Sequence, residues 1–102
     1  MIYVIATIQL ADGKLDEFIE ALRDNLPNVR AEDGCIEYQP TIDLETDFAA
    51  QPDVRPNVVT MLEKWESLAA LRAHLAAPHM LAYRERVKDC VGGVSLQILE
   101  TA

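Results

Sequence analysis

Both histidines of this chain and its only tryptophan fall within residues 61–86, together with one of the three tyrosines. Histidine has an ordinary pKa close to neutrality, so His74 and His79 are candidate proton acceptors. Trp65 could form an aromatic wall against a planar ligand, and the phenol of Tyr83 could hydrogen-bond a ligand oxygen. The segment is therefore the first candidate for a site that binds a small molecule and moves a proton.

Each of these side chains also has an ordinary structural role. Trp65 could be a core residue at the end of a strand, and Tyr83 could belong to an apolar helical stripe. His74 could be a hydrogen-bonded structural histidine, and His79 an exposed residue in the first turn of a helix. Tyr38 could line the same cavity and Asn57 could contact a ligand, although core packing and a turn are the stronger interpretations for these two.

Three elements would position the candidate residues. Residues 57–62 supply a run of β-branched and apolar side chains after Asn57 and predict a strand that ends near Trp65. Ser67 is a suitable N-cap for a helix that follows, and Pro78 suits the first turn of a second helix. Two short helices angled at Pro78 would bring three side chains near that strand end, namely His74, His79 and Tyr83.

The histidines and cysteines of this sequence form no complete set of metal ligands and no CxxC pair. The two histidines stand five residues apart without paired carboxylates nearby, which is an incomplete ligand set, so no metal and no other cofactor is expected. Cys35 and Cys90 form neither a metal-ligand pattern nor a CxxC pair. We expect both to be free thiols.

The first half of the chain predicts a strand, a helix and a second strand. Residues 2–10 carry apolar side chains at the even positions, which predicts a strand. Residues 15–26 carry apolar side chains at helical spacing, which predicts an amphipathic helix. Pro27 is expected to bend or end that helix. Residues 35–43 alternate again, and the proline at position 40 favours a sheet edge or a bulge.

The second half adds a loop and a last strand to the elements already described. Residues 44–56 predict a long polar loop, and residues 91–100 a final strand, with Gly92 and Gly93 expected to stop the preceding helix. The order is β-α-β-β-α-β with the second helix split in two. It predicts one α+β domain over residues 1–102, a ferredoxin-like four-stranded antiparallel sheet with helices on one face.

The other face of this sheet is expected to be apolar. The positions of Tyr3, Ile5, Val59 and Met61 along the strands predict that their side chains lie on this face. A homodimer that packs sheet against sheet is the simplest way to cover such a face.

Charge and composition exclude several classes of partner. The formal net charge is −8 and there is no stripe of lysine or arginine, which argues against nucleic acid and against an anionic membrane surface. The apolar run at residues 1–6 has the length of a strand and lacks a basic n-region, so no signal peptide is expected. These features predict a cytoplasmic protein.

Two stretches carry a resemblance to a known family. Residues 63–74 read EKWESLAALRAH and residues 78–83 read PHMLAY. They resemble the signature of the antibiotic-biosynthesis-monooxygenase-like family of small dimeric ferredoxin-like proteins, and most of all its bacterial quinol monooxygenase type. Residues 32–40, EDGCIEYQP, are similar to that type as well.

The resemblance implies an enzyme that oxidises a quinol or another electron-rich aromatic with O2 and without a cofactor. Triplet oxygen reacts slowly with closed-shell organic molecules, but a deprotonated hydroquinone is a good one-electron donor and can take the place of a flavin or metal. The protein then needs a base, an apolar pocket and orientation, and His74 or His79 is the natural base.

Other activities in the family leave alternatives open. The haem-degrading branch carries an asparagine on its first strand, whereas this strand offers Thr7 and Gln9, which argues against haem. A small-molecule-binding dimeric module without turnover and an isomerase of a small carbonyl compound are the two alternatives. The fold hosts many chemistries and does not separate them.

Overall fold

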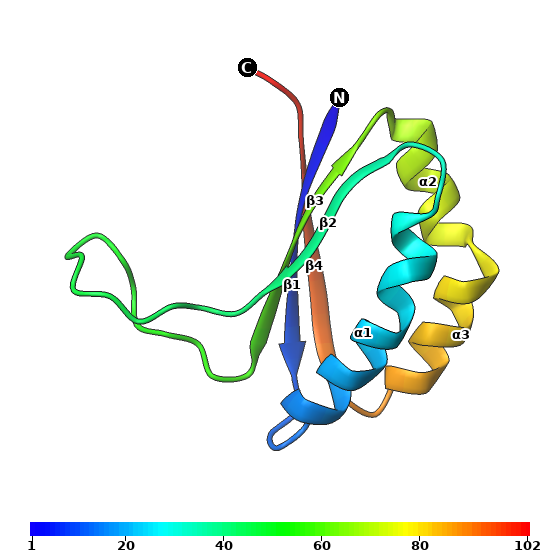
Figure 1. Ribbon diagram of the computed structural model, residues 1–102. Coiled ribbons are helices and arrows are strands. Elements are labelled where there is room, and N and C mark those ends of the chain that lie inside the picture. The colour runs from blue at the N-terminus through cyan, green and yellow to red at the C-terminus, as the bar shows by residue number, and fades with distance from the viewer.

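The computed structural model describes residues 1–102 and contains four strands and three helices (Figure 1). Along the chain these are β1 (Ile2–Leu10), α1 (Leu15–Arg30), β2 (Cys35–Thr41), β3 (Val58–Trp65), α2 (Leu68–Ala76), α3 (Pro78–Val87) and β4 (Val91–Leu99). The order is the predicted one, with the second helix divided into α2 and α3.

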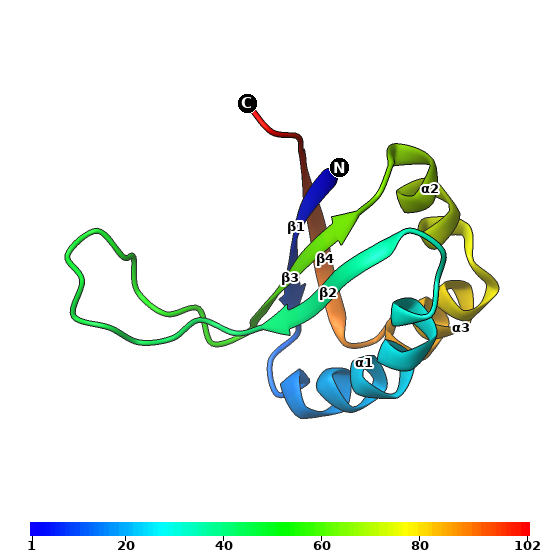
Figure 2. The ribbon, with the colours of Figure 1, turned by 45° about the horizontal axis from the view of Figure 1, so that its top comes forward.

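The four strands form one antiparallel sheet in the order β2-β3-β1-β4. All three helices lie on the same face of this sheet (Figures 1 and 2). The predicted α+β class and the antiparallel sheet with helices on one face are therefore confirmed. As predicted for a strand that contains Pro40, β2 lies at an edge, where a missing backbone donor disrupts no second ladder.

The core lies between the sheet and the helices. On β1 the even positions face the helices, and Val4, Ala6 and Ile8 are buried there. The assignment of Val59 and Met61 to the opposite face was wrong. They pair directly with Ile8 and Ala6, and opposed residues of antiparallel strands share a face, so both belong to the core and are almost fully buried.

Pro27 was expected to bend or end the helix, but α1 continues through it to Arg30, so the proline does not end the helix. Pro27 removes only one hydrogen bond, one turn before the helix ends, and its carbonyl still accepts from the N–H of Ala31. Leu26 and Val29 on either side of it are buried in the core. Their packing favours the helical continuation.

The two short helices begin where Ser67 and Pro78 predicted, whereas α3 does not end where the two glycines predicted. The hydroxyl of Ser67 accepts from the N–H of Ala70, and Pro78 opens α3. Gly92 and Gly93 do not stop α3, which ends at Val87. They lie inside β4, where its pairing with β1 shifts register. Glycine in a strand often marks such an irregularity.

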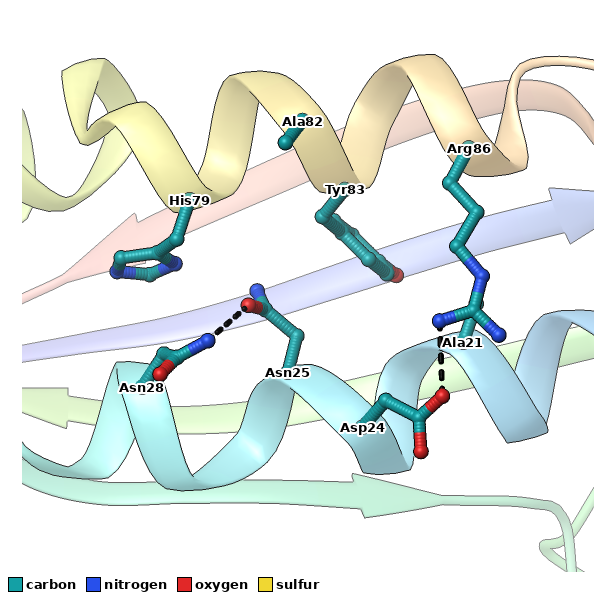
Figure 3. A pocket seen from close by; sticks show the side chains of 8 residues that line it. All are labelled: Ala21, Asp24, Asn25, Asn28, His79, Ala82, Tyr83 and Arg86. Atoms are coloured by element: carbon teal, nitrogen blue, oxygen red, sulfur yellow. Dashed lines mark hydrogen bonds and ion pairs between the residues drawn. The ribbon is translucent and has the colours of Figure 1, made fainter.

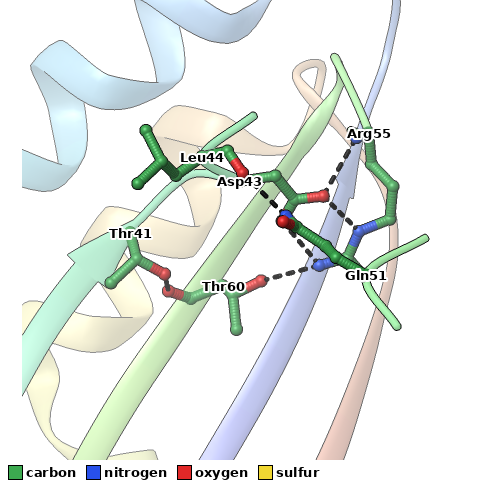
Figure 4. A network of polar contacts seen from close by, with 6 residues as sticks. All are labelled: Thr41, Asp43, Leu44, Gln51, Arg55 and Thr60. Atoms are coloured by element: carbon green, nitrogen blue, oxygen red, sulfur yellow. Dashed lines mark hydrogen bonds and ion pairs between the residues drawn. The ribbon is translucent and has the colours of Figure 1, made fainter. Parts of the chain in front are cut away.

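A long loop between β2 and β3, residues 42–57, projects away from the helices (Figures 1 and 2). We call it the β2–β3 arm. Its base is held by Arg55, which donates to both carboxylate oxygens of Asp43 at 2.8 Å and to the hydroxyl of Thr60 at 3.4 Å (Figure 4). The guanidinium lowers the pKa of Asp43 to about 2 through these hydrogen bonds. Along the arm, Leu44 and Phe48 are exposed.

Candidate functional site

A cavity of about 450 Å³ lies between the sheet and helices α2 and α3. Its lining is mostly apolar, with Ala6, Met61 and Phe18 among the contributing side chains. A volume of this size suits a small organic ligand. The polar side chains that border it are few, namely Tyr38, Glu63, His74, Tyr83, Arg84 and Lys88.

His74 is the histidine that borders this cavity. Helix α2 places it on the buried side, where only 2 % of the residue is exposed. Its Nδ1 lies 2.7 Å from Oε2 of Glu32, and its ring lies 4.6 Å from the ring of Trp65. Burial lowers the pKa of His74, and the carboxylate of Glu32 opposes this shift. With Nδ1–H donated to Glu32, Nε2 is the nitrogen free to take a proton from a ligand.

The sequence interpretation missed Glu32, which orients His74. The residue follows the C-terminus of α1, and the sequence alone assigns it no role of its own within residues 32–40. The turn passes close to α2 because Gly34 has a φ of +83°, and a Cβ at this position would lie 2.6 Å from Cβ of Ala70. Glycine thus gives the close approach that brings the Glu32 carboxylate to His74.

Glu63 is a second group that the sequence interpretation missed. It alternates along β3 with Met61 and Trp65, both fully buried, and its own side chain points into the same layer. Nε1 of Trp65 donates to Oε1 of Glu63 at 3.0 Å. Burial raises the pKa of Glu63 to about 7, against the hydrogen bond from Trp65, which lowers it. An acidic residue at an alternate position among core residues was the available signal.

The aromatic candidates take two different places. Tyr38 and Tyr83 border the cavity, and burial raises the pKa of both phenols, so they are neutral hydrogen-bonding groups. Trp65 is fully buried and does not border the cavity. Its ring packs against the ring of His74 and its Nε1 donates to Glu63, so Trp65 supports these two side chains and does not line the cavity.

His79 and Asn57 lie outside the cavity. His79 borders a separate groove of about 250 Å³ between α1 and α3, with Asn25 and Asn28 on the facing helix (Figure 3). Its Nε2 lies 3.4 Å from Oε1 of Glu32 without hydrogen-bond geometry. Asn57 stands at the opposite end of β3 from Trp65, and its Nδ2 donates to Oδ1 of Asp12 at 2.6 Å, so it joins two turns.

The sequence profile of the family described as antibiotic biosynthesis monooxygenase matches residues 1–86, which is most of the chain. The chain belongs to the antibiotic biosynthesis monooxygenase family. The resemblance seen in residues 63–83 is thereby confirmed. In this member of the family, no group of three histidine, cysteine, aspartate or glutamate side chains is arranged to hold a metal ion. None of its helices combines the length and the apolar character that crossing a bilayer requires.

Relatives of this family member include a curated protein and several solved structures. It is 38 % identical to the Escherichia coli K12 protein named "Probable quinol monooxygenase YgiN", over 98 % of this chain and 97 % of that protein. The crystal structure of PA3566 from Pseudomonas aeruginosa is 26 % identical, with a TM-score of 0.80 over 99 % of this chain and 93 % of that one. A Methanosarcina mazei protein, 24 % identical, has the same fold with a TM-score of 0.83 over 99 % and 92 % of the two chains.

Proposed function

We propose that this protein is a cofactor-independent monooxygenase that oxidises a quinol or a similar electron-rich aromatic with O2. The observation that carries the proposal is the position of His74, whose ring borders an apolar cavity of about 450 Å³ while Glu32 holds its other side. The relative named as a quinol monooxygenase supports the choice of substrate class.

The residues around the cavity fit the first chemical step. A neutral imidazole with Nδ1–H donated to Glu32 presents Nε2 to a substrate hydroxyl and takes its proton. The resulting quinolate then gives one electron to dioxygen, and the semiquinone and superoxide combine at the ring carbon next to the one that carries the oxygen. The peroxide anion formed in this way takes the proton back from His74 and becomes a hydroperoxide. The overall reaction converts one quinol and one O2 into one hydroxyquinone and one water, and no other reductant is needed.

The apolar wall of the cavity supports the same reaction. Side chains such as Met61 and Phe18 exclude water from the ring of an aromatic substrate and favour its binding through burial of apolar area. The phenols of Tyr38 and Tyr83, both neutral, can donate hydrogen bonds to substrate oxygens. Binding and orientation thus come from the lining, and proton transfer from His74.

Oxygen uptake tests the proposal. With 1,4-naphthohydroquinone as substrate, an oxygen electrode should record uptake by the native protein well above spontaneous autoxidation. His74→Gln should lower kcat by about 100-fold or more, the range of a lost general base. His79→Gln is the matched histidine variant. His79 borders the groove and not the cavity, and its Nε2 lies 3.4 Å from Oε1 of Glu32, so the variant should lose far less activity than His74→Gln.

Two results would count against the proposal. A native rate equal to spontaneous autoxidation would exclude the oxygenase. Quenching of tryptophan fluorescence by 1,4-naphthoquinone without any turnover would favour a binding module, and conversion of a small carbonyl compound without oxygen would favour an isomerase.

We also propose that the active form is a homodimer in which two sheets pack face to face. The face opposite the helices carries half-buried Tyr3 and Ile5 and exposed Leu62. Leu62→Glu places a charge on this face and should shift sedimentation equilibrium toward the monomer. Leu81→Glu, on an exposed position of α3, is the control and should leave the assembly unchanged. A Leu62→Glu protein that sediments like the native one would contradict the sheet-to-sheet arrangement.

A further inference from the structure

A second ionisable side chain, that of Glu63, borders the same cavity as His74. Only 8 % of the residue is exposed, and it forms no ion pair with a lysine, arginine or histidine. Burial of a carboxyl group without a basic partner costs free energy of folding. Such a group at the wall of a cavity is a candidate for chemistry there.

The two oxygens of Glu63 have different surroundings. Oε1 accepts a hydrogen bond of 3.0 Å from Nε1 of Trp65. Oε2 has no hydrogen-bond partner in the chain and is not sealed away from solvent, and Glu63 borders the cavity that His74 also borders. The indole that holds Oε1 also packs at 4.6 Å against the ring of His74. One rigid side chain, Trp65, therefore fixes the positions of both ionisable groups.

The environments of Glu63 and His74 suit opposite tasks. Burial raises the pKa of Glu63 to about 7, so a large fraction carries a proton at neutral pH, whereas burial lowers the pKa of His74 and keeps it neutral. When the pKa values of two groups in one site are shifted apart in this way, the group with the raised pKa can act as the acid and the other as the base. The other titratable or charged groups at this site come from the turn after α1, from β2, and from α3 and the residue that follows it, namely Glu32, Cys35, Tyr38, Tyr83, Arg84 and Lys88.

We propose that Glu63 is a catalytic residue that donates the proton needed to break the oxygen–oxygen bond of the substrate hydroperoxide. The inference rests on the proposed function. The electron pair of the ring C–H bond becomes the new C=O π bond, the O–O bond breaks, and the leaving hydroxide takes the proton of Glu63 and departs as water. The C–H proton passes to the carboxylate and restores the acid.

Loss of this proton donor opens a different path. The hydroperoxide can instead break its C–O bond and release hydrogen peroxide, which leaves the quinone. Both paths consume one O2 for each quinol, so they balance equally and differ only in products. Glu63 therefore decides between hydroxyquinone with water and quinone with hydrogen peroxide, while His74 controls whether oxygen is consumed at all.

The experiment measures oxygen uptake and both products for native protein, Glu63→Gln and His74→Gln with 1,4-naphthohydroquinone. Glutamine keeps the shape of the side chain and can accept the hydrogen bond from Trp65, but it cannot serve as the acid. We expect Glu63→Gln to take up oxygen within about fivefold of the native rate. Its yield of 2-hydroxy-1,4-naphthoquinone per O2 should fall at least about tenfold, with hydrogen peroxide making up the difference.

The outcomes separate this inference from the proposed function. A native-like product ratio in Glu63→Gln, or native protein that makes only naphthoquinone and peroxide, overturns the role of Glu63 and leaves oxygen-dependent oxidation standing. Native uptake no faster than autoxidation removes both. If Glu63→Gln does not fold, the native protein supplies the test, since its peroxide yield should rise as the pH passes above about 7. A peroxide yield that is constant between pH 6 and 9 contradicts the inference.

Discussion

The carboxylate of Glu32, just past the end of α1, lies 2.7 Å from Nδ1 of His74, 42 residues further along the chain. The contact fixes the orientation of a ring that borders the cavity, and it selects Nε2 as the nitrogen available to a ligand. A base held from behind by a carboxylate is an arrangement found in many enzymes that move protons.

Glu32→Gln should lower kcat for 1,4-naphthohydroquinone by about tenfold or more, with little change in KM. The carboxylate raises the pKa of His74, so its loss makes the imidazole a weaker base and loosens its orientation. The acidic limb of the pH profile should move to lower pH, which a purely structural effect would not cause. Glu20→Gln, on an exposed position of α1, is the control and should retain native kinetics.

Glu63→Gln should change how stability depends on pH. Because the folded-state pKa is about 7 and the ordinary value is 4.5, the folded protein binds more protons than the unfolded chain between these values. This contribution therefore lowers the free energy of unfolding as pH rises through that window, by up to about 3 kcal/mol. Glutamine removes it, so urea unfolding should show the variant gaining stability relative to native protein from pH 5 to pH 8. A constant difference between the two proteins across this range would contradict the raised pKa.

Trp65→Phe should shift the protonation of Glu63 upward. The indole N–H stabilises the carboxylate through the 3.0 Å hydrogen bond, so its removal raises the pKa of Glu63 further. If Glu63 is the proton donor, hydroxyquinone formation should persist to higher pH in this variant than in native protein. The substitution also leaves space in the core and should cost about 1–3 kcal/mol of stability, measured by urea unfolding.

Gly34→Ala should be more harmful than Gly13→Ala, although both glycines have positive φ. Alanine at position 13 meets no atom within 4 Å and should cost only about 1 kcal/mol for the backbone conformation. At position 34 its Cβ would lie 2.6 Å from Cβ of Ala70, so the turn must move away from α2. We expect a loss above about 2 kcal/mol in urea unfolding, together with lower oxygen uptake, because Glu32 moves with the turn. Equal losses for both variants would show that the close approach is unimportant.

The architecture could be predicted from local patterns in the sequence. The alternation in residues 2–10 and the helical stripe in residues 15–26 each indicate which side of the element faces the core. The starts of α2 and α3 could be predicted because Ser67 is a good N-cap residue and Pro78 suits the first turn of a helix. Pro27 does not end α1, because tertiary packing of its neighbours outweighs one lost hydrogen bond. The faces of Val59 and Met61 depend on strand register, which one strand alone does not reveal.

The site was less predictable because it depends on contacts between distant segments. His74, Tyr38 and Tyr83 do border one cavity, whereas His79 and Asn57 face other parts of the surface. Glu32 was missed because only the tight turn at Gly34 brings it to α2. Glu63 could have been found, since its alternation with Met61 and Trp65 places a carboxyl group in the core layer.

The most direct test of the proposed role of His74 is the distance between its Nε2 and the nearest oxygen of bound 1,4-naphthoquinone in a crystal structure of the complex. We expect the quinone ring to occupy the cavity between the sheet and helices α2 and α3, with this distance in the hydrogen-bonding range of roughly 2.6–3.2 Å. A quinone bound elsewhere, or one whose oxygens all lie beyond the reach of His74, would contradict this role.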